Sequence, residues 1–140
     1  MIYNKIKTDM MQALKEKRIS DKETLGFLFS QLKNKAIELR VNELEDKDSF
    51  QVIQKFVKSL KEEKESYEKA GRLNALESFD NQINLVESYL PKQLNEDEIK
   101  NIISKLDNKD IPNIMKYFKT NYNGEVDMKL VNQLAKEVNK

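Results

Sequence analysis

Apolar residues recur at steps of three and four along nearly the whole chain, with no alternation typical of strands. This pattern predicts an all-α protein. The first expected helix covers about residues 2–17, and a second, longer helix follows Ser20 and runs to about residue 42. Ser20 and Glu23 have the spacing of a capping box, in which each side chain accepts a hydrogen bond from the backbone N–H of the other.

Two further long helices are expected at about residues 49–70 and 73–90. Asp48 is the expected N-cap of the first, and Gly71 occupies the position where a left-handed residue ends a helix. Pro91 stops the second. Two helices of about 20 residues, each roughly 30 Å long and joined at one glycine, predict an antiparallel hairpin.

A second capping box is predicted at Asn95 and Glu98, at the start of the first of three shorter helices. Leu94 and Ile99 flank this helix start at the two positions of a hydrophobic staple. We therefore expect a helix to begin directly after Asn95, with Ile99 facing the core.

The last two expected helices are separated by Gly124, which we expect to end the first of them. Pro112 lies near the first turn of that helix, where its missing N–H leaves no hydrogen bond unmade. Asp127 is the expected cap of the final helix, and Val126 and Val131 are placed as a staple. Leu130, Leu134 and Val138 are the expected core residues of that helix.

Helix length changes at Pro91, and this change predicts two subdomains. Residues 1–91 form a long-helix N-terminal subdomain that contains the antiparallel hairpin. Residues 92–140 form a small three-helix C-terminal subdomain. At about 50 residues the second is close to the lower size limit for a stable core.

The amino-acid composition excludes most classes of catalytic site. The chain has no Cys, His or Trp, so thiol nucleophiles, histidine bases and the usual zinc ligands are missing. There is no glycine-rich phosphate loop, and every Ser lies in or beside a predicted helix rather than on a tight loop with an oxyanion hole. We expect no catalytic residue, no metal and no cofactor.

Net charge is +1, which by itself predicts neither a nucleic-acid nor a membrane partner. The first 17 residues contain no apolar signal-peptide core. No stretch approaches the roughly 18 apolar residues of a membrane span. The expected location is therefore the cytoplasm.

Charged clusters within the first subdomain have structural interpretations. The acidic residues Glu43, Glu45, Asp46 and Asp48 lack the spacing of a calcium loop and favour the N-terminus of the next helix through its dipole. The run at 58–69 predicts four i,i+4 ion pairs along one exposed helix. These pairs are Lys58–Glu62, Lys61–Glu65, Lys64–Glu68 and Glu65–Lys69.

Lysines of the last two helices are the candidate binding residues. With two tyrosines they suggest a small basic face that binds phosphate and stacks on unpaired bases. The alternative is an ordinary solvated surface, because Glu125, Asp127 and Glu137 lie among them. The residues concerned are Lys116, Lys119, Lys129 and Lys136, with Tyr117 and Tyr122.

Four blocks of the sequence resemble the YqeY-like proteins, in the same order and across nearly the whole chain. They are LKNKAIEL (32–39), EKAGR (68–72), YLPKQLNEDEI (89–99) and GEVDMKLVNQL (124–134). A domain of this family closes the B subunit of the glutamine-dependent aspartyl/glutamyl-tRNA amidotransferase, as a helical tail that engages tRNA. The resemblance implies a long-helix subdomain followed by three short helices.

The resemblance also implies a role in holding tRNA rather than in chemistry, because ammonia production and aminoacyl activation lie on other parts of that enzyme. A carbon–nitrogen ligase label would follow only from relation to the amidotransferase. The implied function is a non-catalytic module that binds tRNA or a tRNA-processing complex. Its candidate contacts are Lys116, Lys119, Lys129, Asn132 and Lys136, and its family landmarks are Gly71, Pro91, Gly124 and Asp127.

Where this sequence differs from the family pattern, it loses positively charged residues more than the residues that define the helices. Glu125 stands where the family often has a basic residue, and Met128 stands where it has a second glycine. Pro112 replaces a glycine, and Gly26 and Phe27 occupy a region that usually carries an arginine. An alternative function is therefore a protein-interaction or structural module in which the long hairpin docks a partner without RNA. An amidase or amidotransferase acting alone is a third.

Overall fold

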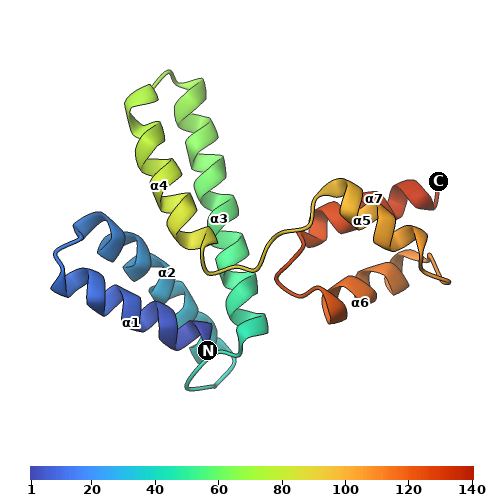
Figure 1. Cartoon of the computed structure of the whole chain (residues 1–140), viewed down its shortest axis with the longest axis horizontal. Coiled ribbons are helices and arrows are strands. Elements are labelled where there is room, and N and C mark those ends of the chain that lie inside the picture. Colours follow the sequence, from blue (N-terminus) through green and yellow to red (C-terminus); the bar gives the residue numbers. More distant parts are fainter. The chain divides into compact units, whose positions relative to one another are not determined.

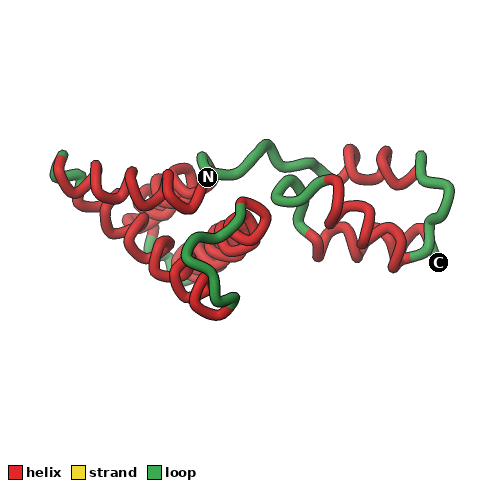
Figure 2. Tube along the Cα trace, turned by 90° about the horizontal axis from the view of Figure 1, so that it is seen from below, coloured by secondary structure: helices red, strands yellow, loops and turns green.

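The computed structural model describes residues 1–140 and is entirely helical, which confirms the predicted all-α class (Figures 1 and 2). No helix combines the length and the apolar character needed to cross a membrane. The elements are α1 (Ile2–Lys15), α2 (Ile19–Glu38), α3 (Asp46–Lys69), the short 3₁₀ turn η1 (Leu73–Ala75), α4 (Leu76–Glu87), α5 (Glu96–Ser104), α6 (Ile111–Asn121) and α7 (Met128–Val138).

The chain divides into two compact units, Met1–Tyr89 and Leu90–Lys140. In unit 1, α1 packs against α2 and α3 packs against α4 (Figure 1). The buried apolar side chains of unit 1 lie at three- and four-residue steps, as an amphipathic helix requires. They include Ile6, Ala13, Leu25, Leu28, Leu32, Ala36, Ile53, Phe56, Val57, Leu60, Phe79, Ile83 and Val86.

Gly71 ends α3 as predicted, in a left-handed conformation with φ +73°. Its N–H donates to the Glu68 carbonyl at 3.0 Å, and the N–H of Arg72 donates to the Tyr67 carbonyl at 2.9 Å. These two bonds define a Schellman motif, which satisfies carbonyls that the helix end would leave free. The chain therefore reverses directly into η1 and α4.

Two other helices of unit 1 end in the same motif without a glycine. Lys17 follows α1 with φ +57°, and Arg40 follows α2 with φ +58°. The N–H of Arg18 donates to the Ala13 carbonyl at 2.9 Å, closing the first of these turns. A side chain in the left-handed region crowds its own carbonyl, so both positions carry backbone strain.

The predicted capping box at Ser20 and Glu23 is wrong. Helix α2 begins at Ile19, with Arg18 at the N-cap position, and no side chain caps it. The turn closed at Lys17 brings the chain straight into the new helix, so Ser20 already lies in the first turn. The Arg18 guanidinium instead bridges Glu16 at 2.8 Å and Asp21 at 2.7 Å.

The predicted cap at Asp48 is also wrong, because α3 begins at Asp46 and its N-cap residue is Glu45. Asp46 and Asp48 both lie in the first turn, where a carboxylate interacts favourably with the positive end of the helix dipole. The Asp46 carboxylate also accepts a hydrogen bond from the Ile2 N–H at 3.0 Å. This hydrogen bond connects the start of α1 to the start of α3.

The α3–α4 hairpin is less symmetric than expected, with 24 residues in α3 and 12 in α4. Of the four predicted ion pairs along α3, the Glu65–Lys69 pair forms, at 3.0 Å. Lys61 and Lys64 instead reach across the hairpin, to Glu87 at 3.2 Å and Asp80 at 2.6 Å. Packing of α4 beside α3 offers these lysines carboxylates that the sequence of α3 alone does not contain.

Unit 2 has its own core, to which all three of its helices contribute. The buried cluster comprises Ile99, Ile103, Ile114, Phe118, Val126, Val131, Leu134 and Ala135. Val138 lies outside this core with 46% of its surface exposed, so its predicted burial is wrong. It is the last residue of α7.

Both helix caps predicted for unit 2 are confirmed. Asn95 accepts from the Glu98 N–H at 2.8 Å, and the Asn95 N–H donates to the Glu98 carboxylate at 3.1 Å. Asp127 accepts from the Lys129 N–H at 2.9 Å. The staple residues Val126 and Val131 are both buried. Local sequence is sufficient at these positions because each cap needs only residues within one turn.

Gly124 does not end α6, which stops at Asn121. Instead it lies in a tight turn, with φ +78°, closed by a 3.0 Å hydrogen bond from the Glu125 N–H to the Tyr122 carbonyl. The Gln93 side chain donates to the Gly124 carbonyl at 2.5 Å, and the Leu94 N–H donates to the Glu125 carbonyl at 2.7 Å. The glycine therefore shapes a turn that fixes the segment before α5.

We predict that Lys17→Gly and Arg40→Gly each raise the free energy of unfolding by about 1 kcal/mol, because glycine relieves the left-handed strain. Urea denaturation measures this as a higher midpoint at an unchanged m-value. Lys22→Gly, inside α2, is the matched control and should lower stability by about 1 kcal/mol. A lower midpoint for both helix-end variants would contradict the prediction.

Substitutions at two of the three glycines are expected to change stability in opposite directions. Gly124→Ala should destabilise the protein by about 1–2 kcal/mol, because its turn requires positive φ. Gly26→Ala should stabilise it by about 0.5–1 kcal/mol, because a Cβ on this helical residue would meet only the Met10 sulfur, at 4.0 Å. Thermal unfolding followed by circular dichroism should show a lower melting temperature for Gly124→Ala and a higher one for Gly26→Ala. Equal shifts of the same sign would contradict the prediction.

Candidate functional site

Surface positions on α6 and α7 hold the five binding residues that the sequence suggests. All four lysines are exposed, and Asn132 is half-buried. None of the four lysines takes part in an ion pair, and the one ion pair of unit 2 joins Lys100 to Glu96 at 3.1 Å. Their ammonium groups are therefore available to an anionic ligand.

Lys129, Asn132 and Lys136 share one stripe of α7, because they are three and four residues apart. Val131 and Leu134 point to the opposite, buried side of the helix. Asp127, two residues before Lys129, is occupied as the cap of the helix, and Glu137, directly after Lys136, forms no ion pair. The structure thus brings these three side chains together on a surface without an ion-paired acid.

Lys116 and Lys119 form a separate pair on α6, on the side away from the buried Ile114. The charge of the segment that forms α6 is positive, because it contains these two lysines and no Asp or Glu. Lysine binds phosphate as a point charge and imposes little geometry. Each helix therefore offers two cations, but neither offers a fixed anion pocket.

The tyrosines beside these lysines are less available than the sequence suggests. Tyr117 and Tyr122 are half-buried and pack on Phe118, with ring centroids 5.9 Å and 5.5 Å away. Their own centroids lie 6.2 Å apart. The rings extend the core of unit 2, so their faces are largely used within the protein.

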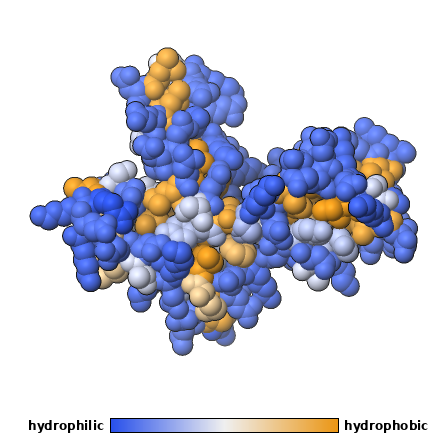
Figure 3. Space-filling view, viewed as in Figure 1, coloured by the Kyte–Doolittle hydropathy of each residue, from blue (hydrophilic) through white to orange (hydrophobic).

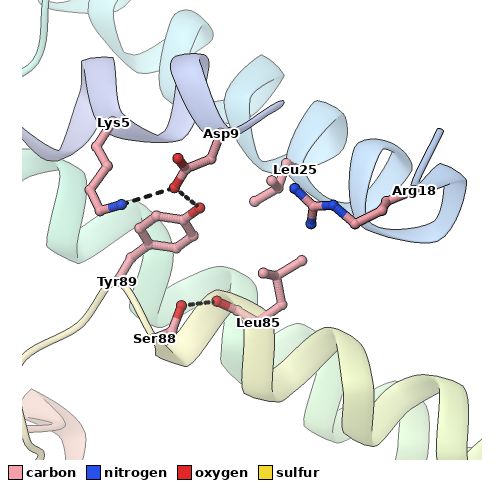
Figure 4. Close-up of a pocket in the computed structure, with 7 residues that line it drawn as sticks. All are labelled: Lys5, Asp9, Arg18, Leu25, Leu85, Ser88 and Tyr89. Carbon is pink, nitrogen blue, oxygen red and sulfur yellow. Dashed lines mark hydrogen bonds and ion pairs between the residues drawn. The ribbon is translucent and has the colours of Figure 1, made fainter. Parts of the chain in front are cut away.

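A pocket in unit 1 was not foreseen from the sequence. It has a volume of about 280 Å³ and lies between α1, the start of α2 and the end of α4 (Figure 4). Its lining combines charged and apolar groups from segments far apart in the chain: Lys5, Asp9, Arg18, Leu25, Leu85, Ser88 and Tyr89.

The polar centre of this pocket is the Asp9 carboxylate, toward which Lys5 and Tyr89 point (Figure 4). The Tyr89 hydroxyl donates to Asp9 Oδ2 at 2.6 Å, and the Lys5 ammonium donates to the same oxygen at 3.1 Å. The ammonium also lies 5.6 Å from the centroid of the Tyr89 ring. Two donors on one oxygen favour the ionised carboxylate.

These contacts determine the protonation states of Asp9 and Tyr89. Partial burial acts to raise the pKa of Asp9, but the hydrogen bonds from Tyr89 and Lys5 outweigh it and hold the pKa below its usual value of 3.8. Burial, with the hydrogen bond to Asp9, raises the pKa of Tyr89 well above its usual range. At neutral pH the acid is ionised and the phenol protonated, so neither group is poised to move a proton.

The Asp9–Tyr89 hydrogen bond is better described as a structural latch. It joins residues 80 positions apart and holds the last residue of unit 1 to α1. No local motif signals a contact at such separation, so sequence patterns could not identify it. We call this contact the Asp9–Tyr89 latch.

We predict that Tyr89→Phe lowers the free energy of unfolding by about 1 kcal/mol near pH 7, because a charged hydrogen bond at a partly exposed site is lost. Since the folded pKa of Asp9 is depressed, this stabilisation is present above its unfolded pKa of about 3.8 and is lost as pH falls through the folded value. Urea midpoints of variant and wild type should converge as the pH falls below 3.8.

Tyr117→Phe is the matched control for the latch, because it removes the same atom from a half-buried ring that makes no side-chain hydrogen bond. Its effect on stability should not change over this pH range. A stability difference between Tyr89→Phe and wild type that stays constant from neutral to acid pH would exclude the ionised latch.

Comparison with known proteins adds one finding. No curated protein matches the chain. A family model described as Yqey-like protein matches residues 3–138, nearly the entire length. The chain therefore belongs to the YqeY-like family.

Proposed function

We propose that this YqeY-like chain is a non-catalytic module that binds tRNA, alone or within a tRNA-processing complex. The observation that carries the proposal is the stripe of α7, where Lys129 and Lys136 are exposed without an ion pair on either side of the half-buried Asn132. Four sequence blocks that resemble the tail domain of the tRNA amidotransferase B subunit support it. Family membership itself is consistent with this role.

The geometry of the stripe suits a phosphate backbone. Lys129 and Lys136 are separated by two helical turns, about 10 Å along the axis. Asn132 lies between them, and its carboxamide can donate to a phosphate or ribose oxygen and accept from a ribose hydroxyl. Lys116 and Lys119 of α6 add two further cations in the same unit.

Binding of this kind should be weak and strongly dependent on salt. Each lysine that neutralises a phosphate releases counterions, so four such contacts to single-stranded or loop RNA give a slope of about −3 in log affinity against log salt. The net charge of +1 adds little long-range attraction. Affinity would therefore come from local lysine contacts.

A direct test is retention of tRNA in a gel-shift or filter assay with the full chain across a salt series. We expect binding that weakens with salt, and we expect Lys129→Gln plus Lys136→Gln to weaken it and to reduce the slope by about 1–2. Lys7→Gln plus Lys22→Gln, two exposed unpaired lysines of unit 1, is the matched control with the same change of charge.

Two results would overturn the proposal. The first is no binding by the wild type at about 0.15 M salt and below. The second is an equal loss in the α7 variant and in the unit 1 control, which would indicate net charge rather than a site. Glutaminase activity, or amidation of Glu-tRNA, by the purified chain would overturn the non-catalytic assignment.

A second candidate function is docking of a protein partner by the α3–α4 hairpin. The observation that favours it is the apolar patch at the hairpin tip (Figure 3), where Leu73 is 64% exposed. Recovery of one protein in a stoichiometric complex that survives nuclease treatment and is lost in Leu73→Asp would support docking in place of RNA binding.

A further inference from the structure

An open groove of about 340 Å³ lies between α2 and α3 in unit 1. Its walls are mainly polar and carry three carboxamides, two lysines, one glutamate and one valine. They are Gln31, Asn34, Lys35 and Glu38 from α2, and Gln51, Val52 and Lys55 from α3. No function described above uses this groove.

The polar groups of the groove are largely unpartnered. The carboxamides of Gln31, Asn34 and Gln51 have no hydrogen-bond partner within the chain. Lys55 is in no ion pair, while Lys35 lies 3.4 Å from Glu38. Three free amides beside one free ammonium make a surface rich in donors and acceptors, with a small excess of positive charge.

Phe27 is not part of the groove lining; it lies one helical turn before Gln31 on α2 and is 68% exposed. It is the only exposed phenylalanine of six in the chain. Phe27 precedes Gln31 by four residues and Asn34 by seven, so all three lie on one stripe of α2. Leu25 and Leu28 fill the core side of the helix, which leaves the Phe27 ring to solvent.

We infer that Phe27 and the α2–α3 groove form a second RNA contact, which takes an unpaired nucleotide. This inference rests on the proposed function and names a separate site for the same partner. The Phe27 ring supplies a stacking face for the base, as aromatic side chains do in recognition of single-stranded RNA. Gln31 and Asn34 meet the base edge or ribose hydroxyl, and Lys55 meets a phosphate.

The chemistry of the groove favours a nucleotide over a peptide. A peptide partner needs apolar pockets for its anchoring side chains, and Val52 is the only apolar residue of the lining. Carboxamides that both donate and accept match base edges and the 2′-hydroxyl. Lys58 follows Lys55 on the exposed side of α3 and also lacks an ion pair, which extends the positive side of the groove.

Photocrosslinking tests the contact directly. The full chain is irradiated with tRNA that contains 5-iodouridine, and crosslinked peptides are identified by mass spectrometry. We expect an adduct on the peptide that contains Phe27. Crosslinks confined to unit 2 would overturn the inference and leave the proposed function intact, whereas no crosslink and no tRNA retention would overturn both.

Substitution separates stacking from simple apolar contact. Phe27→Leu keeps an apolar side chain but loses the aromatic face, so we expect tRNA affinity to fall about tenfold. Phe27→Tyr should retain binding. Ile37→Ala is the matched control, because Ile37 is a 70% exposed apolar residue of the same helix outside the groove lining, and its loss should leave affinity unchanged.

Competition identifies the occupant. A single-stranded oligonucleotide should displace tRNA from the wild type more effectively than a blunt RNA duplex of equal length, and Phe27→Leu should reduce this preference. Wild-type affinity in Phe27→Leu, measured beside an impaired Lys129→Gln plus Lys136→Gln variant, would overturn the inference alone. Melting temperatures equal to wild type exclude unfolding as the cause.

Discussion

Chain reversal at the ends of α1, α2 and α3 is the constraint on which unit 1 depends. At each end a residue enters the left-handed region, namely Lys17, Arg40 and Gly71, and the following N–H closes a Schellman motif. Without these reversals the helices could not fold back, and their apolar faces would remain in water. Two of the three positions are not glycine, so burial in the packed unit must outweigh the local strain.

Pairing of charges differs between the two candidate surfaces and the α3–α4 hairpin or the pocket of unit 1. In the α3–α4 hairpin, lysines reach carboxylates of the opposite helix, as Lys61 and Lys64 do. In the pocket of unit 1, Asp9 accepts from Lys5 and Tyr89, and Arg18 is held between two acids. Such groups already have partners. The lysines of α6 and α7, and Lys55 with its neighbouring amides, have none, so their charges are open to a ligand, as are those of other unpaired lysines such as Lys7 and Lys22.

The two surfaces would contribute different interactions to RNA binding. Lysines on α7 supply charge, which gives affinity without selecting a base. The α2–α3 groove adds an exposed aromatic ring and carboxamides, which favour unpaired nucleotides over duplex. The half-buried tyrosines of α6 cannot take this stacking role, because their rings pack on Phe118. Phe27, which is 68% exposed, offers the free aromatic face instead.

Local sequence determined the helical class, the Asn95–Glu98 capping box, the Asp127 cap and the left-handed Gly71, because each depends on residues within one or two turns. Local sequence patterns gave wrong helix boundaries at Ser20, Asp48 and Gly124. At the first two the helix starts earlier than the motif indicates, and Gly124 shapes a turn held by Gln93 and Leu94. Only the tertiary structure decided the Asp9–Tyr89 latch and the α2–α3 groove. The latch joins residues 80 positions apart, and the groove depends on how two consecutive helices pack. Helical periodicity says which face of a helix is apolar but not which helix will cover it.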